Sequence, residues 1–299
     1  MNRSFVRGVT AAVFAAGSAL WLSPAFAHAV CGDRIFPATL AIDDPGVGDE
    51  VVLPNLNVQS PTGVGQESLT FSWAKTITEN FGVSIQSGFV SQQGSQGGIQ
   101  PITTEEKLKL FCWAEHEFMA SAGFQQTWGF TGTPGVSQNL FNTYTPIIDV
   151  GKGFGDLPKS LNLLRPLAIT AAISENYVTD PTQAPNMFNL GFTLQYSLPY
   201  YNEHVAEIDN SFLKHLVPVV EANFQWPTAN TNPGDYTGLT GTIQPGVIYE
   251  ADTWQFALEA IVPVNAQSGT NVGFVGELHF FLDDIFPNSL GKPLFGGKS

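Results

Sequence analysis

The sequence predicts an all-β protein, a transmembrane antiparallel β-barrel of about 12 strands with a periplasmic N-terminal segment. Two observations support this fold class. Apolar and polar residues alternate with a period of two in long segments throughout the chain. After residue 27, no run of 18 apolar residues remains that could cross a bilayer as a helix.

The composition excludes several other classes. Charged residues make up 13% of the 299 residues, about half the usual share of roughly 25%. The chain has 12 basic residues and a formal net charge of -14, which argues against binding of nucleic acid phosphates. Glycine (30), phenylalanine (23) and proline (20) are abundant, which disfavours long amphipathic helices.

The first 27 residues have the organisation of a secretory signal peptide. Arg3 and Arg7 give a positive start, residues 9–22 are apolar, and Ala25-Phe26-Ala27 is a small-x-small cleavage site. A membrane-anchoring helix is the alternative, but the apolar run is shorter than about 20 residues. We therefore expect a signal peptide at 1–27, a periplasmic segment or plug at 28–49 and an outer-membrane barrel at 50–299.

The clearest alternation runs through residues 116–130, where Phe118, Phe124 and Trp128 share one face. Phe118 and Trp128 are ten residues apart, which in a tilted strand spans roughly 25 Å, the height of a barrel's apolar band. A soluble β-sandwich also alternates, but its strands are typically about 5 or 6 residues long. The residues expected to form aromatic girdles are Phe118, Trp128, Phe188, Tyr196, Trp226 and Trp254.

The same pattern predicts the individual strands and their connections. Short and long connections alternate through much of the chain, as periplasmic turns and extracellular loops do, although 151–164 and 199–214 are long where short turns are expected. The second of these could hold a short helix near 206–215. The predicted strands are 50–58, 67–77, 81–91, 105–114, 116–129, 141–150, 165–177, 186–198, 215–226, 239–250, 253–264 and 271–283.

Three blocks carry a resemblance to a family. They are residues 151–158 (GKGFGDLP) followed by Leu164-Arg165-Pro166, residues 31–39 (CGDRIFPAT), and residues 114–118 (AEHEF). In them the chain resembles uncharacterised bacterial exported proteins similar to the outer-membrane barrels grouped with meta-pathway phenol-degradation transporters. The resemblance implies a barrel that moves small, often aromatic or hydrophobic compounds, and it transfers no functional residue.

A set of acidic residues and one histidine is expected to face the lumen. Such residues could form an acidic constriction that favours cations, or an internal network of ion pairs with Lys107, Lys109 or Arg165 that fills the barrel. Glu277 and His279 point the same way, but without further ligands a hydrogen-bonded pair is favoured over a metal site. The candidates are Glu117, Glu175, Glu221, Glu250, Glu259, Glu277 and His279.

No catalytic or phosphate-binding motif stands out, so we expect no enzyme activity, no cofactor and no metal. A disulfide between Cys31 and Cys112 is chemically allowed in the periplasm. However, alternation with Leu108 and Leu110 places Cys112 on the lipid face, so an intramolecular bond would require the N-terminal segment to pass outside the barrel.

The segment 28–49 is either a plug or a loosely docked periplasmic tail. As a plug it would determine what passes, with its apolar residues Ile35, Phe36, Leu40 and Ile42 lining an oily path.

Taken together, these observations predict an outer-membrane channel for passive passage of small, hydrophobic or aromatic solutes. The alternatives are a non-conducting structural or adhesive barrel and a soluble periplasmic β-sandwich. The expected partners are outer-membrane lipid, a small-molecule solute and the barrel-assembly machinery during insertion, with no nucleic acid.

Overall fold

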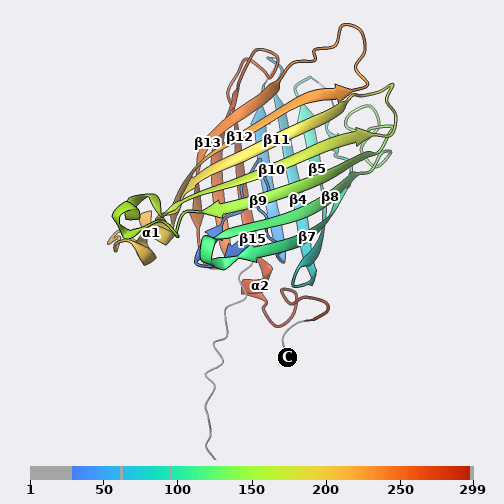
Figure 1. Cartoon of the computed structure of the whole chain (residues 1–299). Helices are drawn as coiled ribbons and strands as arrows, with labels where there is room; N and C mark the ends of the chain where they lie inside the picture. The colour runs from blue at the N-terminus through green and yellow to red at the C-terminus, as the bar shows by residue number, and fades with distance from the viewer. Residues whose placement is uncertain (1–28, 61–62, 95, 297–299) are drawn as a thin grey trace, which may run out of the picture.

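The protein is a closed, all-β barrel of twelve antiparallel strands (Figure 1). The computed structural model describes residues 29–60, 63–94 and 96–296. The predicted signal peptide lies outside these residues. No helix among the described residues is long and apolar enough to cross a membrane.

Each of the twelve predicted strands is present, with ends within three residues of the prediction. The sheet closes because β3 pairs with both β4 and β15. A closed barrel with an apolar exterior confirms the predicted fold class and overturns the β-sandwich alternative. The barrel strands are β3 (Glu50–Gln59), β4 (Gln66–Thr78), β5 (Phe81–Gln92), β7 (Thr103–Trp113), β8 (Phe118–Thr127), β9 (Thr143–Gly153), β10 (Leu167–Val178), β11 (Asn186–Tyr196), β12 (Leu216–Ala229), β13 (Thr240–Glu250), β14 (Trp254–Pro263) and β15 (Gly273–Phe281).

Several short elements accompany the barrel. Of the short helix expected near 206–215, only a 3-10 turn at Leu213–His215 forms. The α-helix of this connection begins earlier, at residue 198, where the Ser197 hydroxyl accepts a hydrogen bond from the Tyr200 N–H and Pro199 occupies the first turn. The elements are β1 (Ala29–Cys31), β2 (Arg34–Phe36), β6 (Gly98–Ile99), η1 (Ala114–His116), η2 (Lys159–Leu164), α1 (Leu198–His204), η3 (Leu213–His215) and α2 (Leu282–Ile285).

The two ends of the barrel differ. One end, here called the terminal end, carries the β1–β2 hairpin, α1, α2 and the C-terminal residues (Figure 1). The other, the loop end, carries the long connections between β5 and β7, between β8 and β9, and between β12 and β13. In outer-membrane barrels the long loops are extracellular and the opposite end faces the periplasm.

Apolar side chains cover the outside of the wall and polar side chains fill the inside. On β11, Phe192 and Leu194 are 42% and 46% exposed, while Thr193 and Gln195, which alternate with them, are buried. Strand β14 repeats the pattern, with exposed Phe256 and Leu258 around buried residues. This is the reverse of a soluble protein and is typical of a barrel surrounded by lipid.

The six aromatic residues expected in girdles divide equally between the two ends. Phe118, Tyr196 and Trp254 lie at strand ends on the terminal side. Trp128 follows the loop end of β8, and Phe188 and Trp226 pack there with ring centroids 4.8 Å apart. Their positions near the two rims of the wall are those at which aromatic rings meet a membrane–water boundary.

A β-bulge in β7 changes the side-chain alternation near its end. Lys109 pairs with Ser121 and Phe111 with Ala120, so Leu110 is an extra residue. Beyond the bulge Cys112 lies on the inner face, opposite buried Met119. The prediction that Cys112 faces lipid is therefore wrong, because it assumed unbroken alternation.

Candidate functional site in the barrel lumen

The N-terminal segment enters the barrel from the terminal end. After the β1–β2 hairpin, residues 38–48 lie against the inner wall and line a cavity of about 560 Å³ together with residues from the strands. This segment (residues 37–49) is called the plug segment below. The two sides of the cavity differ. The plug segment contributes Leu40, Ile42 and Val47 together with the carboxylates of Asp43 and Asp44, whereas the strands contribute mainly amides and hydroxyls.

Glu221 of β12 holds the middle of the plug segment. Its carboxylate is fully buried and accepts hydrogen bonds from the backbone N–H groups of Leu40 (2.7 Å), Ala41 (3.1 Å) and Ile42 (2.8 Å). Three consecutive N–H groups have no strand partner here, and a carboxylate is the strongest acceptor that a side chain can offer them. A single side chain of the wall thus supplies the hydrogen-bond acceptors for three buried N–H groups outside any strand.

Apolar contacts reinforce this attachment. Leu40 packs against a buried cluster of Val217, Val219, Ile248 and Ala257. Ile42 lies over Gly191 of β11, where an added Cβ would be 2.0 Å from the Ile42 side chain. Gly191 therefore provides the space that Ile42 occupies.

Lys107 of β7 holds the plug segment on another side of the lumen. Its ammonium pairs with the Asp43 carboxylate and donates a hydrogen bond to the Asp44 carbonyl oxygen (3.0 Å). The carboxylates of Asp149 (3.8 Å) and Glu105 (3.9 Å) complete its surroundings. The lysine is thus shared between the wall and the plug segment.

Arg34 connects the N-terminal hairpin to the turns of the terminal end. It is fully buried, pairs with Glu117 at 3.1 Å, and donates to the carbonyl oxygens of Arg165 and Pro166. Its guanidinium also stacks on the Tyr200 ring, 3.9 Å from the centroid. Burial lowers the pKa of Arg34 from its usual value, partly offset by the Glu117 charge, and burial raises the pKa of Tyr200 to about 12.

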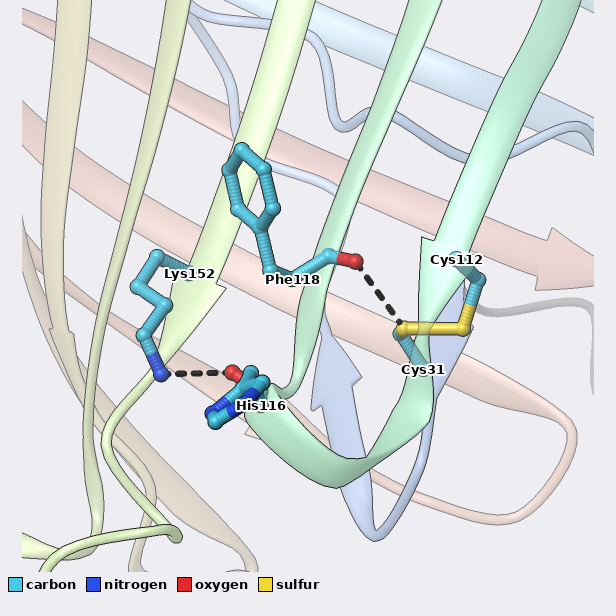
Figure 2. Close-up of a disulfide and its surroundings, with 5 residues drawn as sticks. All are labelled: Cys31, Cys112, His116, Phe118 and Lys152. Carbon is cyan, nitrogen blue, oxygen red and sulfur yellow. Dashed lines mark hydrogen bonds between the residues drawn. A yellow bond between two sulfur atoms is a disulfide. The ribbon is translucent and has the colours of Figure 1, made fainter.

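A disulfide between Cys31 and Cys112 joins the same hairpin to β7 (Figure 2). The Cα atoms are 5.7 Å apart, and Cys31 Sγ lies 3.4 Å from the Phe118 carbonyl oxygen. Beside it, Lys152 donates a hydrogen bond to the His116 carbonyl oxygen in the β7–β8 turn (Figure 2). The bond forms on the inner face, so the segment does not need to pass outside the barrel.

Near the start of β3, polar contacts join this strand to β15 on the inner face of the wall. His279 contacts Glu50 through Nε2 (2.7 Å) and Glu277 through Nδ1 (3.2 Å), and the Asn55 amide donates to Glu277 (2.8 Å). Glu277 and His279 therefore form a hydrogen-bonded pair. Within the described residues, no group of three or more His, Cys, Asp or Glu side chains is arranged to hold a metal ion.

Glu259 also faces inward and is 1% exposed, but no residue in the described part of the chain donates a hydrogen bond to either of its oxygens. Its carboxylate interacts more strongly with that of Glu221, two strands away on β12, than with that of Glu277 on the adjacent strand, and its side chain crosses Gly246 of β13. An added Cβ at Gly246 would lie 2.4 Å from Glu259 Cγ.

The remaining lumen candidates differ in their placement. Glu117 and Glu250 are buried near the terminal end. Glu175 does not face the lumen: it shares the outward row of β10 with Ile173 and Tyr177, and bonds Thr228 (2.7 Å) near the loop end. Glu175 faces outward because residues at every second position of β10 do so, and its charge does not change this alternation.

The four apolar residues expected to line a path also separate into two groups. Leu40 and Ile42 line the cavity. Ile35 and Phe36 belong to the hairpin, and Phe36 is fully buried with Met119 and Ala168. Phe36 therefore anchors the hairpin, and neither residue lines the cavity.

Sequence reasoning missed most of the contacts that place the plug segment. Lys107 was considered only as a counter-charge, and Gln255, which donates to the Ala38 carbonyl oxygen (2.6 Å), was not considered. Arg34 offered the one available signal, because an arginine stands among apolar residues in a chain with only 12 basic residues. Such a residue is buried only with partners.

No protein-family model and no curated protein sequence matches the chain. Solved structures do. An outer membrane channel from Pseudomonas putida F1 is 11% identical, with a TM-score of 0.53 over 83% of this chain and 99% of that chain. The NanC porin (8% identical, TM-score 0.49, 78% and 98%) and the KdgM porin (10%, 0.46, 77% and 98%) are more distant. The chain therefore has the fold of an outer-membrane channel, a porin-like barrel.

Proposed function

We propose that this protein is an outer-membrane channel through which small solutes pass passively, and that the plug segment determines which solutes pass. The observation that carries this proposal is the cavity of about 560 Å³ left between the plug segment and the wall. A barrel that served only as a structural or adhesive surface would have no need of an internal cavity lined by two different kinds of surface.

The lining supports small aromatic or hydrophobic solutes that also carry a hydrogen-bonding group. The plug segment presents Leu40, Ile42 and Val47 to the cavity. The opposing strands present amides and hydroxyls, among them Asn176, Asn189, Thr145 and Ser174. A phenol-like compound, with an apolar ring and one hydroxyl group, matches both surfaces.

The charge of the cavity favours a second candidate, small cations. Six carboxylates line it, against one lysine and one histidine. Lys107 and His279 each contact two or more of these carboxylates, so the remaining field is negative. Negative charge in a narrow lumen attracts cations and repels anions.

Removal of the plug segment tests the proposal. Deletion of residues 31–49 in a Cys112→Ser background should raise single-channel conductance in planar bilayers severalfold over the matched control, the full-length Cys31→Ser/Cys112→Ser protein. Both proteins must retain the faster gel mobility of an unboiled barrel. An unchanged conductance would contradict the proposal that the plug segment controls passage through the barrel.

Solute class is tested with vesicles that contain the full-length protein. Neutral phenols should enter faster than neutral sugars of similar size, and potassium should carry more current than chloride. Absence of any solute flux in both the full-length and the deleted protein would instead support the non-conducting barrel.

A further inference from the structure

Two connections at the terminal end are long where a barrel ordinarily has short turns, and both expose apolar side chains. In η2, between β9 and β10, Leu161, Leu163 and Leu164 are 44%, 60% and 46% exposed. At the start of η3, between β11 and β12, Phe212 and Leu213 are 58% and 43% exposed. These five residues are called the interfacial shelf below.

The shelf lies on the lipid side of the wall. The Tyr196 hydroxyl donates a hydrogen bond to the Leu163 carbonyl oxygen (3.1 Å). Tyr196 belongs to the outward row of β11, in line with Phe192 and Leu194. The backbone of η2 is therefore fixed to a lipid-facing side chain at the edge of the apolar band.

The η3 part is connected to the same band by aromatic stacking. The Phe212 ring stacks on Tyr249 with centroids 5.4 Å apart, and Tyr249 stacks on Trp254 at 5.6 Å. Tyr249 and Trp254 continue the outward rows of β13 and β14. The girdle at this end thus extends beyond the wall into η3.

Figure 1 shows the connection that contains η2 and the one that contains α1 projecting together at one side of the terminal end of the barrel. A projection of this kind at the edge of the apolar band is within reach of the boundary between lipid headgroups and acyl chains. Leucine and phenylalanine are residues that insert at this boundary.

We propose that the interfacial shelf is a lipid-binding surface that inserts into the periplasmic leaflet of the outer membrane and fixes the depth of the barrel on the side of β9–β14. Its partner is the phospholipid monolayer, because the shelf continues the lipid-facing surface through Tyr196 and Trp254. The proposal is independent of what the channel conducts.

Spin labels at introduced cysteines test the insertion. The two native cysteines form a disulfide and no free cysteine occurs among the described residues, so an unreduced protein is labelled at the new site. Leu163→Cys and Phe212→Cys are the test variants. Leu194→Cys is the lipid-exposed control, and Glu115→Cys, exposed in the β7–β8 turn at the same end, is the water-exposed control.

After reconstitution into phospholipid vesicles, the ratio of oxygen to nickel-chelate accessibility should be severalfold higher at Leu163→Cys and Phe212→Cys than at Glu115→Cys, and close to that at Leu194→Cys. A ratio equal to that of Glu115→Cys would show that the shelf lies in water, as a docking surface for a soluble partner would. Low accessibility to both reagents would show that the shelf packs on its own chain. Either result overturns the proposal, provided that each variant keeps the faster mobility of the unboiled barrel.

Discussion

The barrel wall and the N-terminal segment inside it are stabilised in different ways. The wall repeats one interaction, the backbone hydrogen bond between neighbouring strands, along twelve pairings. Among the described residues, the N-terminal segment has no such ladder beyond the three residue pairs of the β1–β2 hairpin, and it is held by the Cys31–Cys112 disulfide and by single side chains, chiefly Arg34, Glu221 and Lys107. One substitution is therefore expected to loosen the segment while the wall stays closed.

Arg34→Ala should give the largest effect. It leaves the Glu117 carboxylate buried without its cation, since the two side chains are 1% and 5% exposed. Breaking a buried pair by removing one partner costs roughly 3–5 kcal/mol. Limited proteolysis should then cut the N-terminal segment while the barrel core resists.

The matched control is Arg34→Ala/Glu117→Ala, which removes both charges. It should protect the segment better than the single variant does, because no unpaired charge remains buried. If the core is digested together with the segment, the segment and the wall are one cooperative unit and the contrast between them is lost.

This contrast also explains what the sequence could predict. The wall was predictable because its pattern is local: β8 and β14 alternate residue by residue, and turn residues mark their ends. The plug segment was not, because the contact of Glu221 with Ile42 joins residues 179 positions apart. Nothing near either residue in the sequence marks that pairing.

Local irregularity accounts for the misplaced cysteine. The bulge at Leu110 inverts the alternation for three residues, and apolar sequence on both sides of it hides the change. Glu175 shows the opposite error: the alternation with Ile173 was intact, but its charge suggested the lumen. Near the rim an outward carboxylate can still reach hydroxyl groups such as that of Thr228.

Loss of the disulfide should give the next effect. Cys31→Ser/Cys112→Ser removes a crosslink between residues 81 positions apart, which typically contributes roughly 2–4 kcal/mol. The urea concentration at which the N-terminal hairpin becomes accessible to protease should fall. Reductant should produce the same fall in the native protein and none in the double variant; sensitivity of the double variant to reductant would contradict this assignment.

A smaller effect is expected for Glu221→Gln, which keeps the side-chain size but weakens the acceptor for the Leu40, Ala41 and Ile42 N–H groups. Hydrogen bonds to a charged group contribute roughly 1.5–3 kcal/mol. Single-channel recordings should show more frequent openings. Thr193→Val, a buried wall substitution without a hydrogen bond to the plug segment, should leave the recordings unchanged.

The smallest effect concerns pH, at the point where the plug segment joins the wall. Asp283 of α2 lies beyond the last strand, and the preceding Leu282 N–H donates to the Asp49 carbonyl oxygen (2.7 Å). Burial, and then the charge of Glu50, raise the pKa of Asp283 to about 8. The folded state therefore holds a proton that the unfolded chain, with an ordinary aspartate pKa near about 4, has released.

Because the folded pKa is the higher one, the contribution of Asp283 to stability is complete below about pH 4 and declines as the pH rises to about 8. Asp283→Asn removes this dependence. The free energy of unfolding of the native protein, minus that of the variant, should therefore fall as the pH rises from 5 to 9, by on the order of 2 kcal/mol after allowance for partial exposure. Urea titrations at several pH values measure the difference. If this difference in unfolding free energy stays constant or rises with pH, Asp283 is already charged in the folded barrel. The end of the plug segment would then be held by charged groups, as its middle is.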